Sequence, residues 1–272
     1  MIEMASAVLT SIRGQAWHTL WVGLVLLIFE LLMPASRYSL QSRVRGYLFW
    51  LAYIAFTASA LVLFGRLWAK LGISPLLVLH PAELLDSRAE PLRFLGLAAL
   101  GIAGAIFGDF FYYWFHRLQH ASAFFWRFHS LHHSIREMSA INCYHHFTEE
   151  VFRIPFITIP MSLLVRFDSG PTPVIVATII SMIGLYIHSC TRFNFGFIRY
   201  VVSDNRFHRI HHSVEKQHLN KNFGSFSSLW DQIFGTAHFP KKDEWPETGM
   251  AHMKEPVTFK DFLFAPFLSS KR

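Results

Sequence analysis

Charged side chains are scarce in this chain of 272 residues. Asp, Glu, Lys and Arg together make up 16% of it, and hydrophobic residues make up 52%. Typical soluble domains carry about 25% charged residues, so the chain has too little polar surface for one or two soluble domains. We therefore expect residues 1–272 to form a single membrane-embedded domain with a modest polar part.

Several common motifs are also missing. The two cysteines, Cys143 and Cys190, are far apart in the chain, which argues against a disulfide framework and a cysteine-type zinc finger. No HExxH motif pairs metal ligands with a general base, which counts against a zinc hydrolase. The formal charge is +7, but there is no long Lys/Arg run and no recognition module, so we expect no nucleic-acid partner.

Long apolar runs predict the membrane helices. Runs long enough to span a hydrocarbon core of ~30 Å lie at 17–33, 47–67 and 92–115, and two shorter runs lie at 151–165 and 173–187. The N-terminal membrane helices thus occupy residues 17–67. Arginines follow the first run where a signal peptide would have its cleavage site, so we expect no cleaved signal peptide. The predicted fold class is an all-α, integral membrane helical bundle with about four spanning helices or two hairpins.

Histidine motifs dominate the polar part. HRLQH follows the third apolar run without a break, and an HxxHH pattern occurs twice after it. Residues at i, i+3 and i+4 share one face of a helix, so each motif points its imidazoles in one direction. One ion takes about four ligands, so this many imidazoles predicts two metal ions side by side. The residues assigned to catalysis and metal ligation are His116, His120, His129, His132, His133, His208, His211 and His212.

Two other interpretations compete with this one. A single HxxxH is often only a polar helix face, and a single HxxHH suits a proton relay or a basic interfacial patch, but three such motifs rarely occur together by chance. A His-rich membrane metal transporter or metal-binding protein is the stronger alternative. Transporters place ionisable ligands near mid-membrane on several helices, whereas these histidines lie beyond the predicted spans.

The motifs HRLQH, HSLHH and HRIHH, with NFGSFSSLWDQIFGT after them, make the chain resemble the fatty acid hydroxylase / sterol desaturase superfamily. The resemblance covers residues 95–240, the expected His-box core. It implies a cytosolic His-rich helical cap with two iron ions, for which zinc can substitute during purification, and O2 as co-substrate. It also implies His188 and His146 as metal ligands. The sequence CYHHF lacks the Arg and Pro that flank the family's histidine at this place, so His145 is a rival to His146.

Three polar side chains are candidates for orienting metal-bound imidazoles by accepting their second N–H. Asp109 lies seven residues before His116 on the same helix face, although a buried carboxylate bonded to a neighbouring helix fits the sequence equally well. Asp231 and Asn142 are weaker candidates. Asn205, just before the third motif, is a candidate N-cap of its helix.

The resemblance implies a membrane-bound non-haem di-iron oxygenase. Such an oxidoreductase would hydroxylate or desaturate C–H bonds of a lipid or sterol-like substrate, with electrons from a separate carrier such as a ferredoxin or a b-type cytochrome. The Arg-rich loop at 37–45 and the basic C-terminal part predict an active site that faces the cytoplasm, on the inner membrane in a bacterium. An acidic carrier would be steered to this basic face.

Overall fold

The computed structural model describes residues 2–81, 89–167 and 172–268. The α-helices are α1 Ile2–Leu32, α2 Leu40–Leu71, α4 Glu90–Ala121, α5 Ala123–His133, α6 Glu149–Arg153, α7 Ile159–Leu164, α8 Thr172–Tyr186, α9 Asn205–His211, α10 Leu229–Ile233 and α11 Phe259–Leu268. The shorter elements are η1 Ile154–Thr158, η2 Gly196–Tyr200, η3 Lys216–His218 and the paired strands β1 Leu77–Leu79 and β2 Val165–Phe167. The two short strands are a minor addition, so the predicted all-α class is confirmed.

Three helices, α1, α2 and α4, are long and apolar enough to cross a membrane. They have 31, 32 and 32 residues, and at 1.5 Å per residue each exceeds the ~30 Å hydrocarbon core. Large apolar side chains such as Trp17, Leu31 and Phe94 point outward, an arrangement that suits lipid rather than water. The integral membrane bundle is therefore confirmed. Among the described residues three helices qualify as spans, and the fourth apolar helix, α8, has only the shorter stretch Ile175–Tyr186.

The first two membrane helices begin earlier in the chain than the apolar runs predicted. α1 begins at Ile2 rather than at residue 17, because Arg13 and Gly14 continue the helix without interrupting it. α2 begins at Leu40, where the Ser39 hydroxyl accepts a hydrogen bond from the backbone N–H of Ser42 at 3.1 Å. α4 runs unbroken from Glu90 to Ala121, so the third span continues into the first histidine motif, as predicted.

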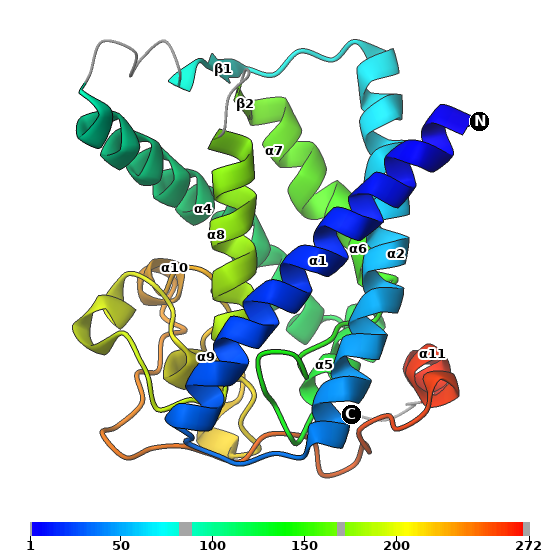
Figure 1. Ribbon diagram of the computed structural model, residues 1–272. Coiled ribbons are helices and arrows are strands. Elements are labelled where there is room, and N and C mark those ends of the chain that lie inside the picture. The colour runs from blue at the N-terminus through cyan, green and yellow to red at the C-terminus, as the bar shows by residue number, and fades with distance from the viewer. Residues whose placement is uncertain (1, 82–88, 168–171, 269–272) are drawn as a thin grey trace.

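The helices are arranged so that one end of the bundle carries all the histidine motifs (Figure 1). α1 and α2 run antiparallel to each other, and α4 packs against α8. The β1–β2 pairing joins the connection after α2 to the connection before α8, at the end of the bundle where the N-terminus lies. α5, α9 and α10 lie at the other end. The two connections at the β1–β2 end agree with the predicted pair of hairpins.

A glycine sets the close approach of α4 and α8. A Cβ added at Gly101 would lie 3.0 Å from Cγ2 of Ile175 and 3.3 Å from Cδ1 of Ile179. Lipid-embedded helices associate through such close van der Waals packing, because lipid tails supply no hydrophobic force between helices. The absence of a side chain at Gly101 therefore lets α4 and α8 pack closely.

A buried carboxylate fastens the membrane helices to the histidine-rich end. Glu30, near the end of α1, has a fully buried side chain and pairs with Arg43 of α2. Its Oε1 accepts hydrogen bonds from the backbone N–H groups of Ala140 at 2.9 Å and Cys190 at 3.0 Å. One carboxylate thus joins two spans to two loops beside the histidine motifs, which gives this intramembrane acid a structural role.

Replacing Glu30 with Gln should destabilise the protein by about 3–5 kcal/mol, because the change leaves the Arg43 charge buried without its partner. Thermal unfolding of the detergent-solubilised variant, followed by tryptophan fluorescence, measures the loss. Glu90→Gln is the matched control, since Glu90 pairs with Arg93 at an exposed site and its removal should leave the melting temperature unchanged. Equal melting temperatures for Glu30→Gln and the wild type would contradict this role.

Candidate metal centre

α4 supplies the first two histidines at its far end, one helical turn apart. His116 is 1% exposed, and its ring lies 4.4 Å from the ring of His211. Its Nε2 atom is 2.9 Å from Nε2 of His129. The ring of His120 lies 4.7 Å from that of His133. The unbroken helix therefore carries the first motif into direct contact with the second and third motifs.

α5 carries the second motif and follows α4 after a single residue. Ser122 takes an extended conformation, with φ −98° and ψ 124°, which ends α4 and lets α5 pack back against it. The spacing within α5 then places His129, His132 and His133 on its buried side, where none of the three is more than 5% exposed.

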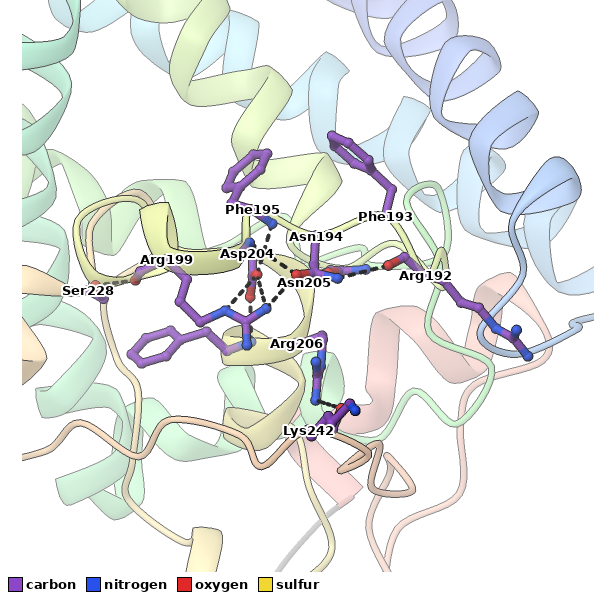
Figure 2. Close-up of polar contacts among 12 residues, drawn as sticks. Arg192, Phe193, Asn194, Phe195, Arg199, Asp204, Asn205, Arg206, Ser228 and Lys242 are labelled. Carbon is purple, nitrogen blue, oxygen red and sulfur yellow. Dashed lines mark hydrogen bonds and ion pairs between the residues drawn. The ribbon is translucent and has the colours of Figure 1, made fainter.

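α9 carries the third motif and is held at its start by a polar network (Figure 2). The Asp204 carboxylate caps the helix by accepting a hydrogen bond from the backbone N–H of Phe207 at 2.9 Å. Arg199 pairs with the other oxygen of this carboxylate at 2.8 Å. Asp204, rather than the predicted Asn205, is therefore the cap. The Asn205 amide instead donates to the carbonyl of Thr191 at 2.7 Å.

A ninth histidine follows α8 and joins the second and third motifs. Nε2 of His188 lies 3.1 Å from Nε2 of His132 and 3.1 Å from Nε2 of His208. Asn205 donates a further hydrogen bond to the carbonyl of Ser189. The start of α9 is thereby tied to the segment that carries His188.

The nine histidines form two neighbouring groups whose ligand atoms lie within 4.8 Å of one another in each group. The first group, the five-histidine group, consists of His116, His120, His129, His133 and His211. The second group, the four-histidine group, consists of His132, His188, His208 and His212. All eight histidines of the three motifs therefore come together, with His188 as the ninth.

Backbone carbonyls orient four of these imidazoles. Nδ1 lies 2.7–3.2 Å from a carbonyl oxygen in His116, His132, His188 and His211, where the partners are Phe223, Tyr144, Gly184 and Lys221. A carbonyl oxygen only accepts, so Nδ1 carries the proton of the neutral ring and Nε2 presents a lone pair.

These lone pairs face one another across short distances. The Nε2 atoms of His132 and His188 are 3.1 Å apart, and two lone pairs at this distance repel each other unless a cation attracts both. Nitrogen ligands about 2.0–2.1 Å from one ion lie roughly 3.0–3.4 Å apart. Nε2 of His211 is also buried without a hydrogen-bond partner. The donor set therefore fits bound metal ions.

Burial keeps six of these imidazoles neutral at pH 7. Burial lowers the pKa of His188 and of His211 to about 3. Burial and neighbouring imidazoles hold the pKa well below its ordinary value in His132, His133, His208 and His212. Neutral imidazole is the form that ligates metals, so no proton has to leave these rings before an ion binds.

A buried carboxylate that the sequence did not single out lies behind the five-histidine group. Glu149 has one oxygen 3.5 Å from Nδ1 of His129 and the other 3.2 Å from Nδ1 of His145. The Gln119 amide donates to it at 2.9 Å. Burial alone would raise the pKa of Glu149, but His145 and His129 hold it well below its usual range. The one sequence signal was its position four residues after His145.

The structure separates the two rivals His145 and His146. His145 stacks on His132 with ring centroids 3.8 Å apart, and it forms a third group with His129 and Glu149. His146 is not brought to the centre. Its Nδ1 lies 2.7 Å from the Thr148 hydroxyl and its Nε2 lies 3.4 Å from a backbone carbonyl in α11.

The predicted orienting carboxylates act on a loop rather than on an imidazole. Asp109 accepts four hydrogen bonds from the segment 225–227, at 2.9–3.1 Å. Asp231 accepts hydrogen bonds from the backbone N–H groups of Phe223 and Gly224 at 2.8 Å each. The carbonyl of Phe223 accepts the hydrogen bond from Nδ1 of His116, so both acids position this imidazole through the loop.

Asn142 does not contact the predicted metal-binding histidines either. Its amide donates to the carbonyl of Glu137 and to the carboxylate of Glu255, both at 3.0 Å. The same Glu255 carboxylate pairs with Arg45 of α2 at 2.5 Å. Asn142 thus helps to attach the loop after α5 to the membrane helices.

A cavity of about 390 Å³ opens beside the five-histidine group. His120, His133 and His211 line it, together with His212 of the second group and Trp126. The rest of the wall comes from segments within 213–220 and 249–252. Small molecules can therefore reach the histidines from this side.

Comparison with known proteins agrees with this arrangement of motifs. The model of the fatty acid hydroxylase family matches residues 101–236, which is half of the chain and includes the three motifs. The chain belongs to the fatty acid hydroxylase family. This finding confirms the resemblance drawn from HRLQH, HSLHH and HRIHH.

Two relatives of the chain are lipid-modifying enzymes. The ornithine lipid hydroxylase OlsE of Rhizobium tropici is 29% identical over 86% of this chain and 72% of its own length. The human alkylglycerol monooxygenase is 27% identical over 53% of this chain. The aligned part covers only 31% of that enzyme's length. No solved structure matches the chain.

Acidification should destabilise the metal-free protein. The unfolded chain has histidines with a pKa of about 6.5, whereas the buried rings stay neutral, so the unfolded state binds more protons below that pH. Stability is therefore fully present above pH 6.5 and is lost as the pH falls towards about 3. For His188 alone, the loss at pH 5 is about 2 kcal/mol, at 1.36 kcal/mol per pH unit below 6.5.

Thermal unfolding of chelator-treated protein at pH 7.5 and at pH 5 measures this dependence. His188→Gln removes one of the groups and should make the pH dependence shallower than in the wild type. A melting temperature that stays constant or rises on acidification would contradict the buried, neutral state of the imidazoles.

Proposed function

We propose that the chain is a membrane-bound non-haem oxygenase that hydroxylates a C–H bond of a lipid at a centre of two metal ions. The observation that carries the proposal is the pair of neighbouring imidazole groups at one end of a membrane bundle of the fatty acid hydroxylase family. One relative, similar over 86% of the chain, is an ornithine lipid hydroxylase.

The two groups divide the ligands between the two ions. The five-histidine group would hold one ion and the four-histidine group the other. Iron is the proposed native metal, because imidazole suits iron and zinc alike and only iron of these two changes oxidation state; zinc can replace it during purification. When bound, the iron pair supplies the activation of O2 that no side chain can supply.

The chain's own residues set the conditions for this chemistry. The carbonyls of Phe223, Tyr144 and Lys221 fix which nitrogen of each bonded ring points inward, and Glu149 lies behind His129. In hydroxylation, C–H, O2, two electrons and two protons give C–OH and water. The reaction becomes a desaturation if a second hydrogen is lost instead, and the relatives' names favour hydroxylation.

Topology supports a centre that faces the cytoplasm. The connection between α1 and α2, with Arg37, and the first turns of α2, with Arg43 and Arg45, lie at the same end as the histidine groups. The predicted Arg-rich loop at 37–45 is therefore partly helical. An excess of Arg and Lys is typical of the cytoplasmic side. In a bacterium this membrane would be the inner membrane. We propose that a separate electron carrier, a ferredoxin or a b-type cytochrome, docks at this end through an acidic face.

The transporter alternative has less support. A transport path needs ligands distributed along the membrane helices near mid-membrane. The two histidine groups instead lie together at the end of α4, just after α8, and on and beside the non-spanning helices α5 and α9.

Replacing His132 or His211 with Ala should abolish turnover, because each removes a ligand from one of the two groups. Membranes containing each variant are supplied with isotopically heavy O2, and mass spectrometry follows the heavy oxygen in extracted lipids. His80→Ala is the matched control, because His80 is an exposed histidine next to β1 at the other end of the bundle. Turnover retained in either ligand variant would refute the proposed centre.

Glu149→Gln should weaken metal binding by roughly 10- to 100-fold, the usual cost of losing a carboxylate behind a metal-bound histidine. Metal retained after dialysis against graded chelator concentrations measures the change. Glu150→Gln is the control, because the adjacent carboxylate accepts a hydrogen bond from Tyr53 and not from a histidine. If both variants lose metal equally, the effect is one of folding and the assigned role of Glu149 is wrong.

A further inference from the structure

A separate set of metal-ligating side chains lies outside the two histidine groups. His218, His238 and Glu244 bring one ligand atom each to within 4.8 Å of one another. His218 is 1% exposed, and the rings of His218 and His238 lie 4.8 Å apart, nearly perpendicular. None of the three belongs to the histidine motifs, and they come from a part of the chain that follows α9.

The nitrogen of His218 that faces this set is buried and has no hydrogen-bond partner. Nε2 lies 3.2 Å from Oε1 of Glu244 but makes no hydrogen bond there. Nδ1 of the same ring is occupied, 2.8 Å from the Ser213 hydroxyl. A separation near 3.2 Å is expected for a nitrogen and an oxygen that share one ion at about 2.0–2.2 Å.

Contacts outside the set also hold the backbone of His238 and the side chain of Glu244. The backbone of His238 is held by Asn222, which donates to its carbonyl at 2.8 Å and accepts from its N–H at 2.7 Å. Oε2 of Glu244 accepts a hydrogen bond from the backbone N–H of Lys241 at 2.8 Å, which leaves Oε1 towards His218. Such outer contacts are typical of ligands that are oriented before the ion binds.

We propose that His218, His238 and Glu244 form a third metal site, which binds one Zn²⁺ ion. Two imidazoles and one carboxylate are a known zinc ligand set, with a water molecule at the fourth position. The ion would tie η3 to the segment 238–244. Ser213 and Leu219, on either side of η3, line the cavity beside the five-histidine group, so the site would stiffen one wall of that cavity.

Metal analysis by mass spectrometry of zinc-loaded, desalted protein tests the site. His238→Ala should bind one zinc ion fewer per chain than the wild type, and His80→Ala should bind the same number as the wild type. This difference does not depend on how many ions the two histidine groups hold, so it is independent of the proposed function. Equal zinc content in His238→Ala and the wild type would overturn the third site.

A second variant distinguishes loss of a zinc ligand from loss of the zinc ion by misfolding. His238→Cys keeps a ligand at this position, so it should regain the ion that His238→Ala loses. With Co²⁺ in place of zinc, the thiolate ligand should give a near-ultraviolet sulfur-to-cobalt charge-transfer band that the wild type lacks. If the band is missing although the variant has the wild-type melting temperature, His218 and Glu244 form an ion pair only and the proposal fails.

Discussion

The whole histidine-rich end depends on one electrostatic constraint. Neutral imidazoles are buried with their lone pairs towards one another, as between His132 and His188, whose Nε2 atoms are 3.1 Å apart. Neutral rings in this position repel, and protonated rings would be costly to bury, so cations among the nitrogens would stabilise the arrangement. The proposed lipid hydroxylation is consistent with this constraint, because iron ions held by neutral ligands would stay strongly positive.

The rest of the fold holds the imidazoles in this unfavourable arrangement. Carbonyls from different parts of the chain fix the ring nitrogens, and two buried carboxylates, Asp109 and Asp231, clamp the loop that presents the carbonyl of Phe223. Glu30 joins the membrane helices to the loops beside the site. Each of these acids accepts at least two backbone hydrogen bonds, so folding energy from outside the centre offsets the repulsion within it.

The features that could be predicted from the sequence are those that depend on helical periodicity. Spacing on a helix determines which side His129, His132 and His133 share, so spacing alone was enough to group the histidines of each motif. Glu149 was missed because a non-helical loop brings it back to His129, and the spacing of residues in the sequence does not predict the course of such a loop. The same loop decides between the adjacent His145 and His146. For Asp109 the sequence left two roles open, an imidazole partner or a buried carboxylate bonded elsewhere, because its partners are more than a hundred residues away in the chain.

We propose that two ions lie side by side in the two histidine groups. Anomalous X-ray scattering at the iron absorption edge, from crystals of iron-loaded wild-type protein, tests it most directly. If the proposed pair of ions is present, the anomalous map should show two separate iron peaks per chain, one within the five-histidine group and one within the four-histidine group. A single peak, or none at either group, would contradict the dimetal centre and the oxygenase built on it.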